Sequence, residues 1–175
     1  MPALKEIVTK AVIGKSKKQL SDTIEVLTDS NISNILGCWI INHKFDGVKT
    51  SEGAKVSGSY DVNIWYSYDD NTKTNVIVKR YDYSDTINVK LKKEEVLSDT
   101  NEIIIRSLVD PKVSDAKIDG DKIKIVVDKE LGVEIVGDVK VRVNIVDDFD
   151  DYEEETEEQL DMDINENYLN GVNQK

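Results

Sequence analysis

Residues 54–68 alternate between two kinds of side chain, and this period of two constrains the fold more than any other feature. In the run AKVSGSYDVNIWYSY, every second position from Val56 to Tyr68 is apolar, aromatic or glycine, and the positions between are mostly Lys, Ser, Asp or Asn. Trp65 is the one large apolar residue on the polar side. Alternation of this kind is typical of a strand with one buried face. Gly58 predicts a bulge or a close approach of another chain segment.

The polar run that follows predicts a hairpin. Residues 69–73 read DDNTK, which are residues that favour tight turns. The next run, TNVIVKRYDYSDTINVKL, is about as long as the first strand and rich in β-branched and aromatic residues. Residues 54–91 are therefore expected to form one long antiparallel hairpin.

Further strands are predicted on both sides of this hairpin. The apolar centre of residues 35–45, ILGCWIINHKF, predicts a central strand, and residues 101–110 predict a strand that ends at Pro111. Residues 119–122, DGDK, predict a turn into a strand over residues 122–136. Gly137-Asp138 predicts a second turn, into a last strand over residues 139–146 with one buried face.

The first residues of the chain fit two structures. In residues 4–13 the apolar side chains match a helix, whereas the content of Ile, Val and Thr favours a strand. The β-rich remainder favours the strand. Gly14-Lys15-Ser16 resembles the end of a phosphate-binding loop, but Thr9 stands where that loop needs its first glycine. We therefore expect a turn there, after the first strand.

These strands predict a mainly β protein, an antiparallel β-sandwich-like single domain over residues 1–146. Acidic residues are concentrated beyond it: residues 147–166 hold twelve carboxylates and no Lys or Arg. The whole chain has 35 acidic and 23 basic residues, so 23 acidic residues remain outside this segment and the rest is balanced. Because a segment that repels itself does not collapse into a core, residues 147–175 are expected to form a disordered acidic tail that is available to partners.

The composition argues against most chemistry. Cys38 and His43 are the only residues of their types, so we expect no disulfide, metal site, cofactor or catalytic residues, and no enzyme. His43 is expected to bond a backbone group, and Cys38 to be a small buried residue. The acidic balance argues against nucleic acid as a partner. No apolar run is long enough for membrane insertion, and the N-terminal residues lack the pattern of a secretory signal, which indicates a cytoplasmic protein.

Aromatic residues gather in two of the predicted strands. Most are expected in the core, but Trp and Tyr are also enriched at protein interfaces. The candidate assembly surface comprises Trp39, Tyr60, Trp65, Tyr66 and Tyr68. Among these, Trp65 is the best candidate because it stands alone on a polar face. The same side chains fit an alternative function, a β-sandwich carbohydrate-binding module in which aromatic rings stack on sugars.

Two runs of residues resemble a known family. They are ILGCWIINHKFD, residues 35–46, and GSYDVNIWYSYDDNTKT, residues 58–74. Both are similar to the outer spore coat morphogenetic protein CotE family of endospore-forming bacteria. Residues 5–15, residues 134–146 and the acidic tail ending in INENYLNGV also resemble that family, so the resemblance extends over nearly the whole chain.

The resemblance implies a structural scaffold made in the mother-cell cytoplasm and later located in the outer coat of the spore. It implies three partners: further copies of itself, the basement layer of spore morphogenetic protein IVA, and outer coat proteins recruited through the C-terminal region. In the residues themselves, a charge-balanced β body does not oppose self-association, and an acidic tail attracts basic partners. The tail side chains that could anchor such partners are Phe149, Tyr152, Ile164, Tyr168 and Leu169.

Overall fold

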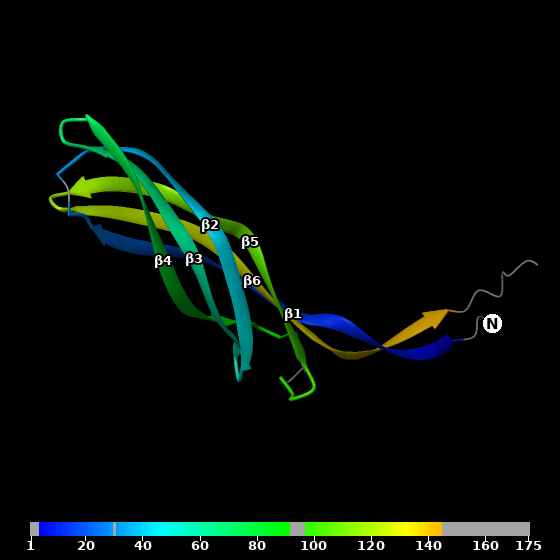
Figure 1. The fold of residues 1–175 in the computed structure, drawn as a ribbon. Coiled ribbons are helices and arrows are strands. Elements are labelled where there is room, and N and C mark those ends of the chain that lie inside the picture. Colours follow the sequence, from blue (N-terminus) through cyan, green and yellow to red (C-terminus); the bar gives the residue numbers. More distant parts are fainter. Residues whose placement is uncertain (1–3, 30, 92–96, 145–175) are drawn as a thin grey trace, which may run out of the picture. The chain divides into compact units, whose positions relative to one another are not determined.

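The computed structural model describes residues 4–29, 31–91 and 97–144, and within them every regular element is a strand. Six strands follow one another along the chain: β1 (Leu4–Leu27), β2 (Ile32–Thr50), β3 (Gly53–Tyr68), β4 (Lys73–Asn88), β5 (Glu102–Asp119) and β6 (Lys122–Asn144). They form two three-stranded sheets, in the orders β1-β6-β5 and β2-β3-β4 (Figure 1). The mainly β, antiparallel, sandwich-like fold class is confirmed, and residues 4–13 are a strand.

Contacts divide the chain into two compact units. One contains the described residues 7–141, which include the two sheets and the core. The other contains the described ends of β1 and β6, residues 4–6 and 142–144, where the Arg142 Nε donates to Glu6 Oε1 at 3.2 Å. The predicted acidic tail lies outside the described residues.

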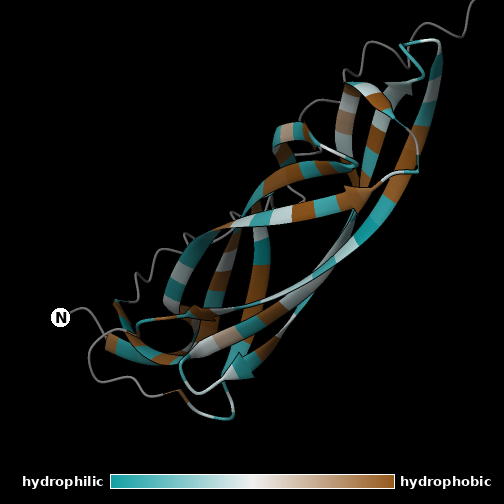
Figure 2. Cartoon of the chain, turned by 90° about the vertical axis from the view of Figure 1, so that its left-hand side faces the viewer, coloured by the Kyte–Doolittle hydropathy of each residue, from teal (hydrophilic) through white to brown (hydrophobic). Residues whose placement is uncertain are grey.

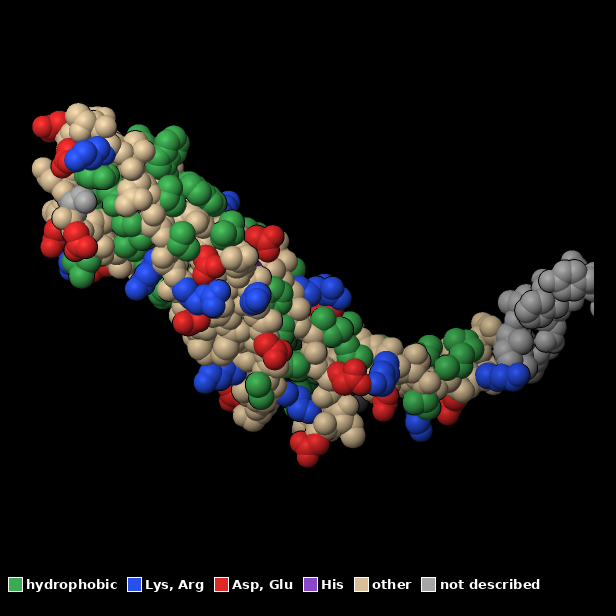
Figure 3. Space-filling view, viewed as in Figure 1, with side chains coloured by type: hydrophobic (Ala, Val, Ile, Leu, Met, Phe, Trp, Pro, Cys, Tyr) green, Lys and Arg blue, Asp and Glu red, His purple; other side chains and the backbone are tan. Residues whose placement is uncertain are grey.

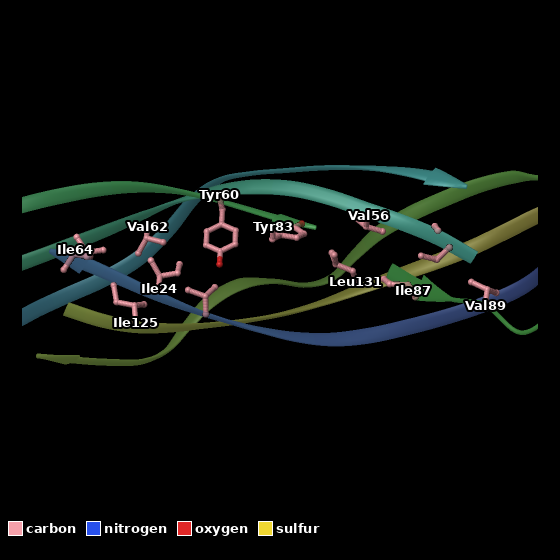
Figure 4. Close-up of a cluster of buried hydrophobic side chains, with 14 of the residues drawn as sticks. Ile24, Val56, Tyr60, Val62, Ile64, Tyr83, Ile87, Val89, Ile125 and Leu131 are labelled. Atoms are coloured by element: carbon pink, nitrogen blue, oxygen red, sulfur yellow. The ribbon is translucent and has the colours of Figure 1, made fainter. Parts of the chain in front are cut away.

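The core lies between the two sheets of residues 7–141. Figure 2 shows hydrophobic and hydrophilic residues alternating along the strands, as a strand with one buried face requires. On β3 the side chains of Val56, Tyr60, Val62 and Ile64 are fully enclosed, as the alternation predicts. They meet residues of β1 and β6, including Ile24, Ile125 and Leu131 (Figure 4). Each fully buried Val, Leu or Ile contributes about 1.5–3 kcal/mol.

The β3–β4 hairpin has the predicted position and turn. Its register runs from the pair Gly53 and Asn88 to the pair Tyr68 and Lys73. Asp69, Asp70 and Asn71 all have positive φ, between 50° and 64°. Asp and Asn tolerate this left-handed conformation better than other side chains, apart from glycine.

Three predicted strand limits are wrong, and close packing explains two of them. Gly137 does not begin a turn, because β6 continues to Asn144; a Cβ on Gly137 would lie 2.6 Å from Asn101 Nδ2 and 2.8 Å from Ile13 Cδ1. Gly14 lies inside β1, where a Cβ would lie 2.8 Å from a Leu91 methyl carbon. These glycines therefore allow neighbouring segments to approach. Pro111 lies within β5, at a register shift on the edge of its sheet, where no strand partner needs its missing N–H.

The strand predicted to be central, over residues 35–45, is part of β2 and stands at the edge of its sheet. Its apolar residues are explained by its neighbours: β2 contacts β5 of the other sheet, and a Cβ on Gly47 would lie 2.5 Å from Ile105 Cγ1. At the opposite edges, Gly14 of β1 bridges Leu91, and the Lys18 Nζ donates to Asp85 Oδ1 at 2.5 Å. Within the apolar run, Ile35, Cys38, Ile40 and Phe45 pack against the core, whereas Leu36, Trp39 and Ile41 are exposed.

The predicted close approach at Gly58 is confirmed and gives a test of the fold. A Cβ there would lie 2.6 Å from the Lys44 backbone oxygen and 2.5 Å from the Tyr83 hydroxyl oxygen. We expect Gly58→Ala to lower the free energy of unfolding by about 1–3 kcal/mol, because a methyl group is forced against backbone. The measurement is urea unfolding followed by circular dichroism.

The matched control is Gly37→Ala in β2. Its Cβ would meet only ordinary contacts, at 3.8 Å from Trp39 Cζ3 and 3.9 Å from Trp65 Cε3. The free energy of unfolding of this variant is expected to lie within about 0.5 kcal/mol of the wild-type value. Equal stability of the two variants would contradict the packing described for Gly58.

Candidate functional site

A charged pair lies in the middle of the sandwich. The Lys129 ammonium of β6 forms an ion pair with the Asp22 carboxylate of β1, and their side chains are 0% and 14% exposed. The two strands are neighbours in the β1-β6-β5 sheet. Taking both charges out of water costs several kcal/mol per ion, so the pair is stable only if further groups compensate it.

Tyrosines of the other sheet provide that compensation. The Tyr60 hydroxyl donates to Asp22 Oδ2 at 2.7 Å. The Lys129 Nζ lies 4.1 Å from the ring centroid of Tyr83 and 5.7 Å from that of Tyr60. A desolvated cation over an aromatic face contributes about 2 kcal/mol. Figure 4 shows the Tyr60 side chain extending from β3 into the space between the sheets.

His43 of β2 extends this network. Its Nε2 and the Tyr83 hydroxyl share a hydrogen bond of 2.8 Å, and its Nδ1 lies 4.0 Å from Asp110 Oδ1. The expected bond from His43 to a backbone group is therefore replaced by one to a tyrosine side chain. We call Asp22, Lys129, Tyr60, Tyr83 and His43 the core polar network.

The environment shifts the pKa values of the uncharged members. Burial, and then the hydrogen bond to Asp22, raise the pKa of Tyr60. Burial and the charge of Asp22 raise the pKa of Tyr83 to about 12. Both phenols therefore stay protonated and keep their hydroxyl donors. Burial lowers the pKa of His43, Asp110 opposes this shift, and Lys129 adds to it.

The network is built to hold charges in the core. Its carboxylate and ammonium neutralise each other, and each is also contacted by an aromatic residue of the opposite sheet. Within residues 4–29, 31–91 and 97–144, no three or more His, Cys, Asp or Glu side chains are grouped as a metal site would need. Nor does that part of the chain contain a helix long and apolar enough to cross a membrane.

The structure separates the aromatic residues that the sequence grouped as one surface. Tyr60 and Tyr66 are enclosed in the core, and Tyr68 is half-buried beside it. Trp39 and Trp65 are 43% and 44% exposed. Trp65 lies on the polar face of β3, as its place in the alternation indicates, and Trp39 lies on the same side of the sheet. Cys38 is half-buried, and burial raises the pKa of its thiol.

The tail residues proposed as anchors lie outside the described residues; they are Phe149, Tyr152, Ile164, Tyr168 and Leu169. The core polar network, by contrast, was missed by sequence reasoning. The signal was present: Lys129 falls in the same alternate positions as Val127 and Leu131, which are both buried. A charged residue at a core position of an otherwise apolar period indicates a buried partner.

The fold and the network define a class: an all-β sandwich whose two sheets are joined by a charged core. The family model described as "Outer spore coat protein E (CotE)" matches residues 3–174. The chain therefore belongs to the outer spore coat protein E family, whose members are structural proteins of the spore coat. No curated protein and no solved structure matched the chain.

The core polar network predicts a large effect of removing one charge. We expect Lys129→Met to lower the free energy of unfolding by about 3–5 kcal/mol, because Asp22 is left buried without its cation. The combined change of Asp22→Leu and Lys129→Met is expected to recover most of this loss. Urea unfolding measures both.

Lys10→Met serves as the control for charge removal, because the Lys10–Glu102 ion pair is 60% and 61% exposed. It is expected to leave the unfolding midpoint unchanged, since exposed pairs contribute little. A Lys129→Met protein as stable as the Lys10→Met protein would show that the buried charges are not coupled.

The lowered pKa of His43 predicts a stability that depends on pH. Below the ordinary histidine pKa of 6.5 the unfolded chain binds a proton that the folded chain resists. The free energy of unfolding is therefore expected to fall as pH decreases from about 7.5 through 6.5 towards the folded pKa. Since His43 is the only histidine, His43→Gln should remove this slope. An unchanged slope in thermal unfolding between pH 7.5 and 5.5 would contradict the assignment.

Proposed function

We propose that this outer spore coat protein is a morphogenetic scaffold: a β body over residues 1–146 that associates with itself and an acidic tail over residues 147–175 that recruits other coat proteins. The match of the outer spore coat protein E family to residues 3–174 is the observation that carries the proposal. The family supports a place in the spore coat. We further propose that the protein is made in the mother-cell cytoplasm before it reaches the coat.

The distribution of charge supports the two roles. Outside residues 147–166 the chain has 23 acidic and 23 basic residues, so its copies do not repel one another through net charge. The twelve carboxylates of that segment attract basic surfaces and speed their encounter. A short tail binds weakly, but many tails on one assembly bind together with high avidity. The partners that we propose are a second copy, the basement layer of spore morphogenetic protein IVA, and outer coat proteins.

Deletion of residues 147–175 tests the division of roles. The truncated protein is expected to keep the β-sheet circular dichroism signal of the full chain and the same number of copies per assembly, as measured by its mass in solution. In spores that carry it in place of the full chain, other outer coat proteins are expected to be strongly depleted from coat extracts, as measured by quantitative mass spectrometry. Normal deposition of those proteins would contradict the recruiting role.

Two full-length variants separate charge from anchoring. One replaces the five proposed anchors by Ala, namely Phe149, Tyr152, Ile164, Tyr168 and Leu169, and keeps all twelve carboxylates. The other replaces the twelve carboxylates by Asn and Gln and keeps the anchors. If only the first variant fails to deposit outer coat proteins, recruitment is assigned to the anchors. If only the second variant fails, recruitment is assigned to the charge.

A further inference from the structure

The outer side of the β2-β3-β4 sheet carries an apolar patch built across all three strands. The register places Gly37, Trp65 and Val76 opposite one another in one row, and Trp39, Asn63 and Val78 in the next. Directly paired residues point to the same side of a sheet. We call this patch the tryptophan face, and its residues are Trp39, Asn63, Trp65, Val76 and Val78.

The apolar members of this face are open to solvent. Trp39, Trp65 and Val76 are each nearly half exposed, and Val78 is 59% exposed. Figure 3 shows hydrophobic side chains gathered over the end of this sheet that contains the 69–72 turn. Large apolar groups that cluster on one face mark an interaction site more often than scattered ones do.

A polar group at the centre of the face has no partner. Asn63 is only 6% exposed, because the apolar side chains around it cover it, and its Nδ2 finds no hydrogen-bond acceptor among the described residues. A buried amide without a partner destabilises a protein until an acceptor reaches it. The face therefore lacks one acceptor that an incoming molecule would supply.

The rows at the two ends of the face carry polar groups that are already satisfied, beside the exposed Ile41, which pairs with Asp61. At one end the Ser67 hydroxyl and the Asn34 amide both donate to Asn71 Oδ1 at 2.7 Å. At the other end Asp61 accepts from the Asn42 amide at 2.8 Å and from Arg80 Nε at 3.0 Å. An apolar centre within a polar border is the anatomy of a protein–protein interface.

We propose that the tryptophan face binds the same face of a second copy of this chain. This inference rests on the self-association in the proposed function and names its surface. Its charge fits such a contact: the nearest ions, Asp61 and Arg80, neutralise each other, so two copies do not repel. An asparagine amide carries both a donor and an acceptor, so Asn63 of each copy can bond Asn63 of the other across a two-fold axis when the side chains that cover it turn aside.

Other occupants fit the face less well. An acidic or basic partner finds no unpaired charge in its centre. A sugar needs several hydroxyl partners beside the rings, whereas the face offers one free donor, on Asn63, and its β4 residues are Val76 and Val78. Two flat, neutral and half-apolar surfaces instead exclude water from each other.

The test measures the mass of the full chain by sedimentation equilibrium over a range of concentrations. Val78→Lys places a charge in the face at a site that is 59% exposed, so the sandwich tolerates it. Its self-association is expected to weaken at least tenfold. Val48→Lys is the matched control, because Val48 is 70% exposed on the same sheet but lies outside the face. Its association is expected to equal that of the wild type.

Fluorescence locates the contact independently of mass. Trp39 and Trp65 are the only tryptophans of the chain, so their emission reports on this face alone. Acrylamide is expected to quench the tryptophan emission of the wild type less as the protein concentration rises. It is expected to quench the emission of Val78→Lys equally at all protein concentrations. Unchanged association in Val78→Lys, or quenching of the wild type that does not depend on concentration, would overturn the proposal.

The same experiments separate this inference from the scaffold function. If Val78→Lys associates as the wild type does and still supports coat deposition, the scaffold stands and its contact lies elsewhere. A wild-type chain that stays monomeric and binds a glycan array saturably overturns the proposal in favour of a carbohydrate surface. Wild-type association that Val78→Lys weakens and Val48→Lys preserves supports the proposal.

Discussion

The buried ion pair between Asp22 and Lys129 is the constraint on which the sandwich depends. Each charge alone would be too costly to bury, and both together are tolerated only where tyrosines of the opposite sheet complete their contacts. Tyr60 donates to the carboxylate, and the ring of Tyr83 lies over the ammonium. The β1-β6-β5 sheet therefore provides the charges, and the β2-β3-β4 sheet provides the groups that stabilise them. Neither sheet has a satisfied inner face without the other.

This pair also selects one alignment of the strands. A slip of one residue in β1 against β6 would turn every side chain of one strand to the other face and leave Lys129 buried without its carboxylate. A slip of two residues would keep the apolar faces of β1 and β6 turned inwards, since their buried apolar residues are largely Ile and Val, but it would still separate Lys129 from Asp22. A charged core is thus a source of specificity more than of stability, which suits strands of 24 and 23 residues.

Alternation predicted the strands better than it predicted their neighbours. The buried residues of β3 and the turn at Asp69 could be predicted from the sequence, because the alternation of side chains and the choice of turn residues depend only on neighbouring positions. The position of β2 at a sheet edge, and the passage of β5 through Pro111, depend on contacts between segments far apart in sequence. For the candidate site, Trp65 was recognisable as an exception to its period. Lys129 was equally exceptional, but its partner Asp22 lies 107 residues away along the chain.

The inside and the outside of the β2-β3-β4 sheet differ in one physical respect. Inside, each charged or hydroxyl group of the core polar network has a partner, so nothing there requires a further molecule. Outside, Asn63 is covered by apolar neighbours yet keeps an unmet donor. Evolution of a lone protein would favour a smaller or apolar residue there, because an unpaired buried amide only destabilises. A residue that costs stability in one copy is understandable where a second copy supplies the acceptor, and the tryptophans on either side would keep water from competing for it.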